Sequence, residues 1–315
     1  MNTISISLEE IYDLAKKTLL SNGCDEENAN ILSDTIMRAE RDGSLSHGLF
    51  RLPAYVAALK SKKVNGKARP EVKKISPSVI KVLGNSAFAP MVLKIGLPEL
   101  IKLAKETGVA VLAITNSHHM AAMWPETETI AEAGLVGFAC TSYKPSVAPA
   151  GAKKALFGTN PICFGTPTGN KVPFILDMST SMINRGKIRR AAKLGLKIPK
   201  GVALDKFGRP TTDPKKAIEG VQLPIAGFKG SGLAWMIDII SGVLTGANHG
   251  GKAKDPFDDF SGPQNVGHLF IVIKPSIFIG NNYLAQIKKN IRIIKKLPKI
   301  KKGNQILYPG EKKYL

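Results

Sequence analysis

Residues 109–141, VAVLAITNSHHMAAMWPETETIAEAGLVGFACT, decide the fold. The apolar run 109–114 has the length of a strand, a helix begins near Pro125 and ends at Gly134, and a second apolar run follows at 135–141. This strand, helix, strand order predicts an α/β sheet that carries helices on its faces.

Working outward, further apolar runs predict strands at 79–83, 174–178 and 268–273. Residues 198–224 hold several glycines and prolines and predict an ordered excursion outside the core. The most apolar segment, 231–245, is too short to span a bilayer, so we expect a buried helix and no membrane segment.

The two ends of the chain are predicted to be helical. A Ser7–Glu10 capping box, further capping residues and apolar periodicity predict helices at 7–23, 25–43 and 53–59, and a basic helix at about 283–297. We therefore divide the chain into an N-terminal helical region (1–75), an α/β core that binds cofactor and substrate (76–274), and a C-terminal basic helix with a strand that returns to the core (275–315).

Composition bounds the function. In 315 residues, 45 Lys and Arg against 24 Asp and Glu give a net charge of +21, which favours an anionic substrate or cofactor and also permits nonspecific contact with nucleic acid. The lysines occur in doublets without interleaved aromatic residues, so we expect no specific nucleic-acid site.

The cysteines and the N-terminus bear on the compartment. Cys24, Cys140 and Cys163 are odd in number and widely spaced, which predicts neither a disulfide framework nor a zinc site. The first residues lack the basic and apolar regions of a signal peptide. We expect a cytoplasmic protein.

The stretch GSLSHGLFR, residues 43–51, combines groups that could carry chemistry. His47 can carry a proton, Ser46 can orient it, and Arg51 can bind an anion. The plainer interpretation is a turn between helices with a surface histidine. A Ser-His hydrolase is excluded because adjacent residues seldom meet as nucleophile and base.

Three more turns are candidate anion sites. Residues 116–122 follow the strand at 109–114, and ligands of open α/β sheets bind beyond the carboxyl ends of strands. The adjacent histidines there have no carboxylate or cysteine at ligand spacing, so we predict no metal. Residues 158–161 form either a structural turn or part of a site. Residues 177–181, followed by Arg185, form either a helix cap or an anion site.

The segment 227–232, GFKGSG, has glycines that permit close backbone approach and a lysine that can reach a phosphate. It is not a phosphate-binding P-loop. It is not the dinucleotide fingerprint either, because Trp235 stands where the third glycine would fall. A standard Rossmann fold is therefore unsupported.

Taken in order, several stretches resemble the malate/L-lactate dehydrogenase family. They are SHGLFRLPAYVAAL (46–59), NSHHMAAMWPETE (116–128), APAGAKKALFGTNPICFGTP (148–167), DMSTSMINRGKI (177–188), IPKGVALDKFGRPTTDP (198–214), LPIAGFKGSGLAWMIDIISGVLTGA (223–247) and PGE (309–311). The second and third blocks are most similar to the branch that reduces the cyclic ketimines Δ1-piperideine-2-carboxylate and Δ1-pyrroline-2-carboxylate.

The resemblance implies an NADPH- or NADH-dependent, metal-free oxidoreductase, usually a homodimer, with a non-Rossmann mixed-sheet cofactor fold. It implies that His47 is the proton donor, that Ser46 is its relay partner, and that Arg51 and Thr159 contact the substrate. The implied cofactor contacts are His118, His119, Met120, Ala121, Ala122, Asp177, Met178, Ser179, Lys229, Pro309, Gly310 and Glu311.

Lys187 departs from the ketimine branch, which carries an acidic residue at this position, whereas other branches carry lysine. We assign Lys187 to a cofactor phosphate. The leading hypothesis is an NAD(P)H-dependent reductase of a small cyclic imino acid. The alternatives are a 2-hydroxy-acid dehydrogenase of the malate or lactate type and, from another class, a basic nucleic-acid-binding protein on an enzyme scaffold.

Overall fold

The structure is a computed structural model that describes residues 5–255, 262–301 and 303–314. Its centre is a seven-stranded sheet of order β1-β2-β3-β9-β4-β5-β6. The strands are β1 (Glu71–Ser76), β2 (Val79–Phe88), β3 (Val109–His118), β4 (Val136–Thr141), β5 (Ile162–Thr166), β6 (Phe174–Met178) and β9 (Val266–Ile273). Only β2 and β3 pair in parallel, so the predicted mixed α/β sheet is confirmed and a doubly wound Rossmann sheet is absent from the described chain.

Two strands of the seven-stranded sheet were not predicted. β1 is a basic, exposed edge strand that straddles the predicted boundary at residue 75, and its EVKKIS sequence lacks an apolar face. β5 is short and follows directly on the turn at 158–161.

β3 is also longer than predicted. Ser117 and His118 were expected in a turn beyond the strand, but they pair with Ala87 and Phe88 of β2. The strand continues through a bulge around Asn116, where φ is +54°.

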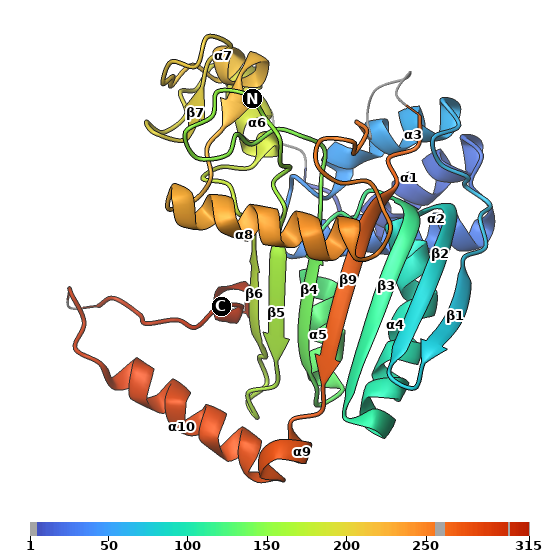
Figure 1. Cartoon of the computed structure of the whole chain (residues 1–315), viewed down its shortest axis with the longest axis vertical. Coiled ribbons are helices and arrows are strands. Elements are labelled where there is room, and N and C mark those ends of the chain that lie inside the picture. The colour runs from blue at the N-terminus through green and yellow to red at the C-terminus, as the bar shows by residue number, and fades with distance from the viewer. Residues whose placement is uncertain (1–4, 256–261, 302, 315) are drawn as a thin grey trace.

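The two faces of the sheet are covered differently (Figure 1). Helices α4 (Ala89–Thr107) and α5 (Trp124–Glu132) pack behind it and enclose the main apolar core. Helix α8 (Phe228–Asp238) and the π-helical segment η2 (Ile239–Val243) cross the other face. The rest of that face carries no helix in this view.

The N-terminal helices are confirmed. They are α1 (Leu8–Ser21), α2 (Glu26–Arg41) and α3 (Leu52–Lys60), and the predicted Ser7–Glu10 capping box is present. Their buried side chains form a second core, which α2 connects to α4.

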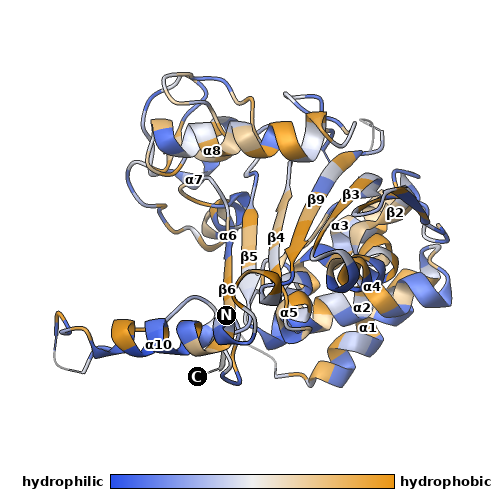
Figure 2. Cartoon of the chain, turned by 60° about the horizontal axis from the view of Figure 1, so that its bottom comes forward, coloured by the Kyte–Doolittle hydropathy of each residue, from blue (hydrophilic) through white to orange (hydrophobic). Residues whose placement is uncertain are grey.

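The apolar segment 231–245 is not the buried helix that we expected. Its inner side packs on the sheet through Ile237, but Trp235 is 62% and Leu244 69% exposed. The sequence is apolar on both sides of the helix, and among the described residues only the inner side packs on the rest of the chain. Apolar residues also run along the neighbouring strands β4, β5 and β9 (Figure 2).

The remaining elements form two outlying parts. The excursion after β6 contains α6 (Arg185–Leu194), β7 (Ala203–Leu204), α7 (Pro214–Glu219) and β8 (Val221–Gln222). Beyond β9, α9 (Ser276–Ile279) leads into α10 (Asn282–Lys296), which extends away from the body and buries only Ile291 (Figure 1). Within the described ranges, no helix is long and apolar enough to cross a membrane.

Candidate active site

A cavity of about 340 Å³ lies at the carboxyl ends of β3, β4 and β6, where strand-end segments meet the loop after α2 and the first turns of α6. This is the edge of the sheet at which ligand-binding segments were expected. Eleven predicted site residues line the cavity: Ser46, His47, Arg51, His119, Met120, Ala121, Ala122, Thr159, Asp177, Met178 and Ser179.

His47 projects from the loop between α2 and η1 (Leu49–Arg51). Its Nδ1 lies 3.0 Å from the Ser46 hydroxyl and 3.1 Å from the Ser44 hydroxyl. A hydroxyl can donate to a neutral Nδ1 or accept from a protonated one, so this pair suits both states of the ring. Burial, aided by the positive charge of Arg51, lowers the pKa of His47 to about 3.

Arg51 is tied back to the same loop, because its Nε donates to the Ser46 carbonyl at 2.8 Å. Arg185 and Arg189 of α6 line the same cavity. Burial raises the pKa of Tyr143, and the nearby positive charges of Arg51, Arg189 and Arg185 oppose that rise. Three guanidinium groups therefore lie near one phenol, on a strongly cationic wall.

Asp177 is the acidic residue of the cavity lining. Its Oδ2 accepts hydrogen bonds from the backbone N–H groups of Met123 and Trp124, at 3.0 and 3.1 Å. Burial raises its pKa to about 6 against the effect of those bonds. The carboxylate thus fixes the start of α5 against the end of β6.

The two adjacent histidines separate in the structure. His119 lines the cavity, and its ring Nδ1 lies 3.3 Å from the Tyr55 hydroxyl. Its backbone N–H donates to Gln264 Oε1 at 2.9 Å. His118 points into the core, where its ring contacts Phe88 and neither ring nitrogen has a hydrogen-bond partner among the residues that the structure describes. Among the described residues, no group of three or more His, Cys, Asp or Glu side chains could hold a metal.

Other predicted residues lie outside the cavity. The Lys187 side chain is exposed, and its backbone N–H bonds to Asn184 as part of the α6 cap. Lys229 is exposed in the first turn of α8. Gly310 lines a smaller adjoining cavity with Asp177 and Trp124, next to Pro309, whose carbonyl accepts from Ile175. Glu311 pairs with Lys295.

Several lining residues were missed from sequence. Tyr143 and Lys144 follow the end of β4, so the strand-end rule could have found them. Ser44 belongs to the stretch already chosen, and Arg189 stands one helical turn after Arg185, on the same face of α6. Trp124 gave no signal, because a tryptophan at a helix start is usually core.

The cavity residues fit an anionic dinucleotide. Their charged groups are mainly guanidinium donors, and within the described part of the chain the buried Nε of Arg185 has no hydrogen-bond acceptor. Ala121 and Ala122 also line the cavity, and their small side chains leave room for a planar ring. Arg185, Arg189 and the 119–122 segment would hold such a group.

Comparison with known proteins gives consistent relatives. The sequence is 39% identical to a Δ(1)-pyrroline-2-carboxylate reductase of Ancylobacter novellus, over 99% of this chain and 90% of the relative. It is also 39% identical to a (2R)-3-sulfolactate dehydrogenase (NADP(+)) of Chromohalobacter salexigens, over 90% and 84%.

Solved structures agree. The Δ1-piperideine-2-carboxylate reductase of Pseudomonas syringae superposes with a TM-score of 0.91 at 35% identity, covering 99% of this chain and 92% of that one. The sequence profile of the malate/L-lactate dehydrogenase family matches residues 6–315. The chain belongs to the malate/L-lactate dehydrogenase family.

Proposed function

We propose that this chain is an NAD(P)H-dependent reductase of a small cyclic imino acid of the Δ1-pyrroline-2-carboxylate or Δ1-piperideine-2-carboxylate type. The observation that carries the proposal is the meeting of His47, its two hydroxyl partners and Arg51 in one cavity. Relatives named for this activity are 35–39% identical over nearly the whole chain.

Arg51 binds the substrate carboxylate through its guanidinium and so fixes the neighbouring C=N carbon in the cavity. Thr159, at the amino end of β5, provides a second contact to the substrate. A bound reduced nicotinamide supplies the hydride. His47 delivers the proton to the imine nitrogen from the ring nitrogen that faces the cavity.

The electrostatics of His47 depend on the substrate. Without a ligand, the low pKa keeps the imidazole neutral at pH 7. A carboxylate on Arg51 cancels one cause of that low pKa, so substrate binding raises the affinity of His47 for a proton. The Ser44 and Ser46 hydroxyls can turn to accept from the protonated Nδ1, which stabilises the charged ring.

A 2-hydroxy-acid dehydrogenase is the second candidate. The same proton donor and carboxylate contact serve a C=O group, and the three guanidinium groups near Tyr143 would suit a substrate with two acid groups. The identity to the sulfolactate dehydrogenase equals that to the pyrroline-2-carboxylate reductase, so overall identity does not separate the two.

A substrate panel tests the proposal. We expect oxidation of NADPH or NADH with Δ1-pyrroline-2-carboxylate or Δ1-piperideine-2-carboxylate, faster than with pyruvate, oxaloacetate or 3-sulfopyruvate. Comparing the two cofactors on the best substrate decides the preference for NADP or NAD. Turnover of oxo acids alone would replace the imine reductase with the dehydrogenase.

We also propose a homodimer that forms through the outer face of α8 and η2. Six apolar side chains of this face are 40–83% exposed: Phe228, Trp235, Met236, Ile239, Val243 and Leu244. They leave on the order of 600 Å² of apolar surface exposed, close to the ~800 Å² that each partner buries in a standard interface. Light scattering should give a dimer, and Leu244→Glu should shift it toward monomer; a monomeric parent protein would contradict this.

Two further parts of the proposal are the compartment and the lack of a specific nucleic-acid site. All three cysteines are buried and unpaired, as suits a reducing cytoplasm. Scattered lysines should bind nucleic acid only weakly and lose it as salt rises. Selective binding that survives physiological salt would favour the nucleic-acid alternative.

A further inference from the structure

Trp124 connects the His47 loop to the side of the cavity lined by residues 119–122 and Asp177, which is the cofactor side in our proposal. The loop carries His47 between α2 and η1, and the hydroxyl partners of the ring belong to the loop itself. These local bonds hold the ring against its own loop. They do not set where the loop sits relative to the strand ends.

The indole ring reaches the loop from α5. Trp124 Nε1 donates to Asp42 Oδ2 at 3.0 Å, and the indole meets the His47 ring edge to face, with centroids 6.3 Å apart and planes at 87°. Its backbone N–H donates to Asp177 at 3.1 Å. One residue therefore contacts the proton donor, the start of its loop and the end of β6.

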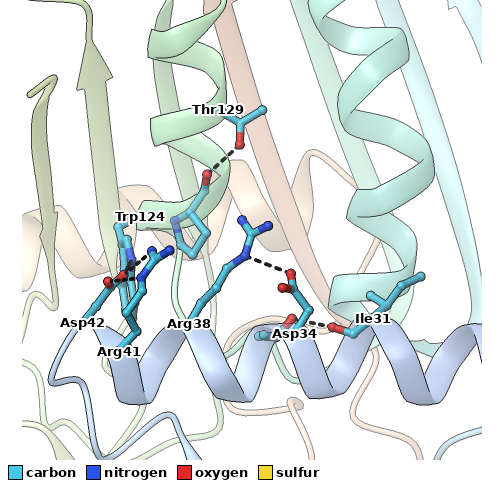
Figure 3. Close-up of polar contacts among 9 residues, drawn as sticks. Ile31, Asp34, Arg38, Arg41, Asp42, Trp124 and Thr129 are labelled. Carbon is cyan, nitrogen blue, oxygen red and sulfur yellow. Dashed lines mark hydrogen bonds and ion pairs between the residues drawn. The ribbon is translucent and has the colours of Figure 1, made fainter. Parts of the chain in front are cut away.

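The acceptor of this bond is itself fixed. The Asp42 carboxylate is only 6% exposed, and Arg41 bonds to it through Nε at 2.8 Å and Nη2 at 3.3 Å. In Figure 3 the indole and the Arg41 guanidinium meet at Asp42, at the end of α2, while Arg38 turns to Asp34 one helical turn earlier. A buried carboxylate with two donors is a rigid anchor.

We propose that Trp124, anchored by Asp42, is a positioning residue that sets the orientation of His47 toward the cofactor side of the cavity. The assignment rests on the proposed role of His47 as proton donor. Proton transfer is sensitive to such placement, because a misplacement of about 1 Å can cost on the order of a hundredfold in rate.

Kinetics of three variants test the proposal: Trp124→Phe, Asp42→Ala and the double variant. Trp124→Phe keeps an aromatic ring and removes the Nε1 donor, and Asp42→Ala removes the acceptor. We expect each to lower kcat about tenfold on the best substrate of the panel, with the cofactor KM within about threefold. Since both remove one bond, the double variant should be no slower than the slower single variant.

Asp34→Ala is the matched control. It breaks an arginine pair on the same helix, but that pair is exposed and neither residue lines the cavity. We expect an unchanged kcat. A kcat within about twofold of the parent for Trp124→Phe, or effects that multiply in the double variant, would overturn the positioning role.

Fluorescence gives a readout that does not depend on turnover. The chain has two tryptophans, so Trp235→Phe leaves Trp124 as the sole indole. In that background, loss of the Nε1 bond in Asp42→Ala should shift the emission maximum, and Asp34→Ala should not. An unshifted emission maximum would contradict the anchoring of Trp124 by Asp42. A normal kcat in His47→Ala would instead overturn the proposed proton donor while the fluorescence result still judged the anchor.

Discussion

The His47 loop and the His118–His268 region hold histidines that differ in burial and in surroundings: His47 is half-buried, whereas His118 and His268 are 1% and 0% exposed. All three have a pKa lowered to about 3, chiefly by burial. His47 opens onto a cavity with Arg51 and has two hydroxyl partners. His118 packs on Phe88 and has no hydrogen-bond partner in the described ranges, and His268 bonds to Ser117 at 2.8 Å. Access to the cavity and a neighbouring anion site, and not a shifted pKa alone, distinguish the histidine that we propose as proton donor.

The largest expected effect is on turnover when His47, the cavity-facing histidine of this comparison, is replaced. His47→Ala should lower kcat by about a hundredfold or more. The reason is that His47 is the described group that hydrogen-bonds to both the Ser44 and Ser46 hydroxyls and can carry the proton. Cofactor affinity, measured by fluorescence titration, should stay near that of the parent. Near-normal turnover would remove His47 from the mechanism.

Arg51→Lys tests the anion site beside His47. Lysine keeps the charge and loses the planar fork, so we expect the substrate KM to rise about tenfold with a smaller change in kcat. Steady-state kinetics on the best imine of the panel measure both. An unchanged KM would mean that another group, such as Arg189, holds the carboxylate.

The two core histidines, His118 and His268, predict that the stability of the protein depends on pH. A buried histidine with a lowered pKa stays neutral when folded, while the unfolded chain takes up protons below pH 6.5. The stability due to these histidines is therefore complete above pH 6.5 and is lost as pH falls toward 3. In urea unfolding, His118→Leu should flatten this loss, because it removes one such group and leaves no unsatisfied nitrogen. A slope equal to that of the parent would show that His118 is protonated in the folded state.

Sequence patterns predicted the layers of the fold well, because capping residues and apolar periodicity are local. The Ser7–Glu10 box and the inward face of α2 are present as expected. β1 escaped prediction because an edge strand needs no apolar face, and the exposure of Trp235 escaped it because hydropathy does not say what covers a helix.

The site was predicted in part. Residues after the ends of β3 and β6 come together at one edge of the sheet, as expected. The alternation of β3 sends His118 to the core, which its place beside His119 could not reveal without the length of the strand. The contact between Trp124 and Asp42 joins residues 82 positions apart, and no local pattern encodes such a distance.

The smallest expected effect concerns Lys187, which departs from the ketimine branch and which we assigned to a cofactor phosphate. Its side chain is exposed and outside the cavity lining, and its backbone N–H serves the α6 cap. Gly186, the residue before it, lies against Ser46, so α6 itself contacts the His47 loop. A long cation one residue further can reach a cofactor phosphate only from the rim, where solvent screens it.

Lys187→Ala should therefore weaken NADPH binding by about threefold or less and leave kcat and its pH profile unchanged. Arg190→Ala, which removes an exposed charge from the same helix, is the matched control for a general loss of positive charge. Fluorescence titration of NADPH and a pH profile of kcat on both variants separate the possibilities. If Lys187→Ala raised the apparent pKa in the kcat profile while cofactor affinity stayed constant, Lys187 would act on His47, because removing a nearby cation favours the imidazolium. Lys187 would then influence the proposed proton donor, although its side chain lies outside the cavity lining.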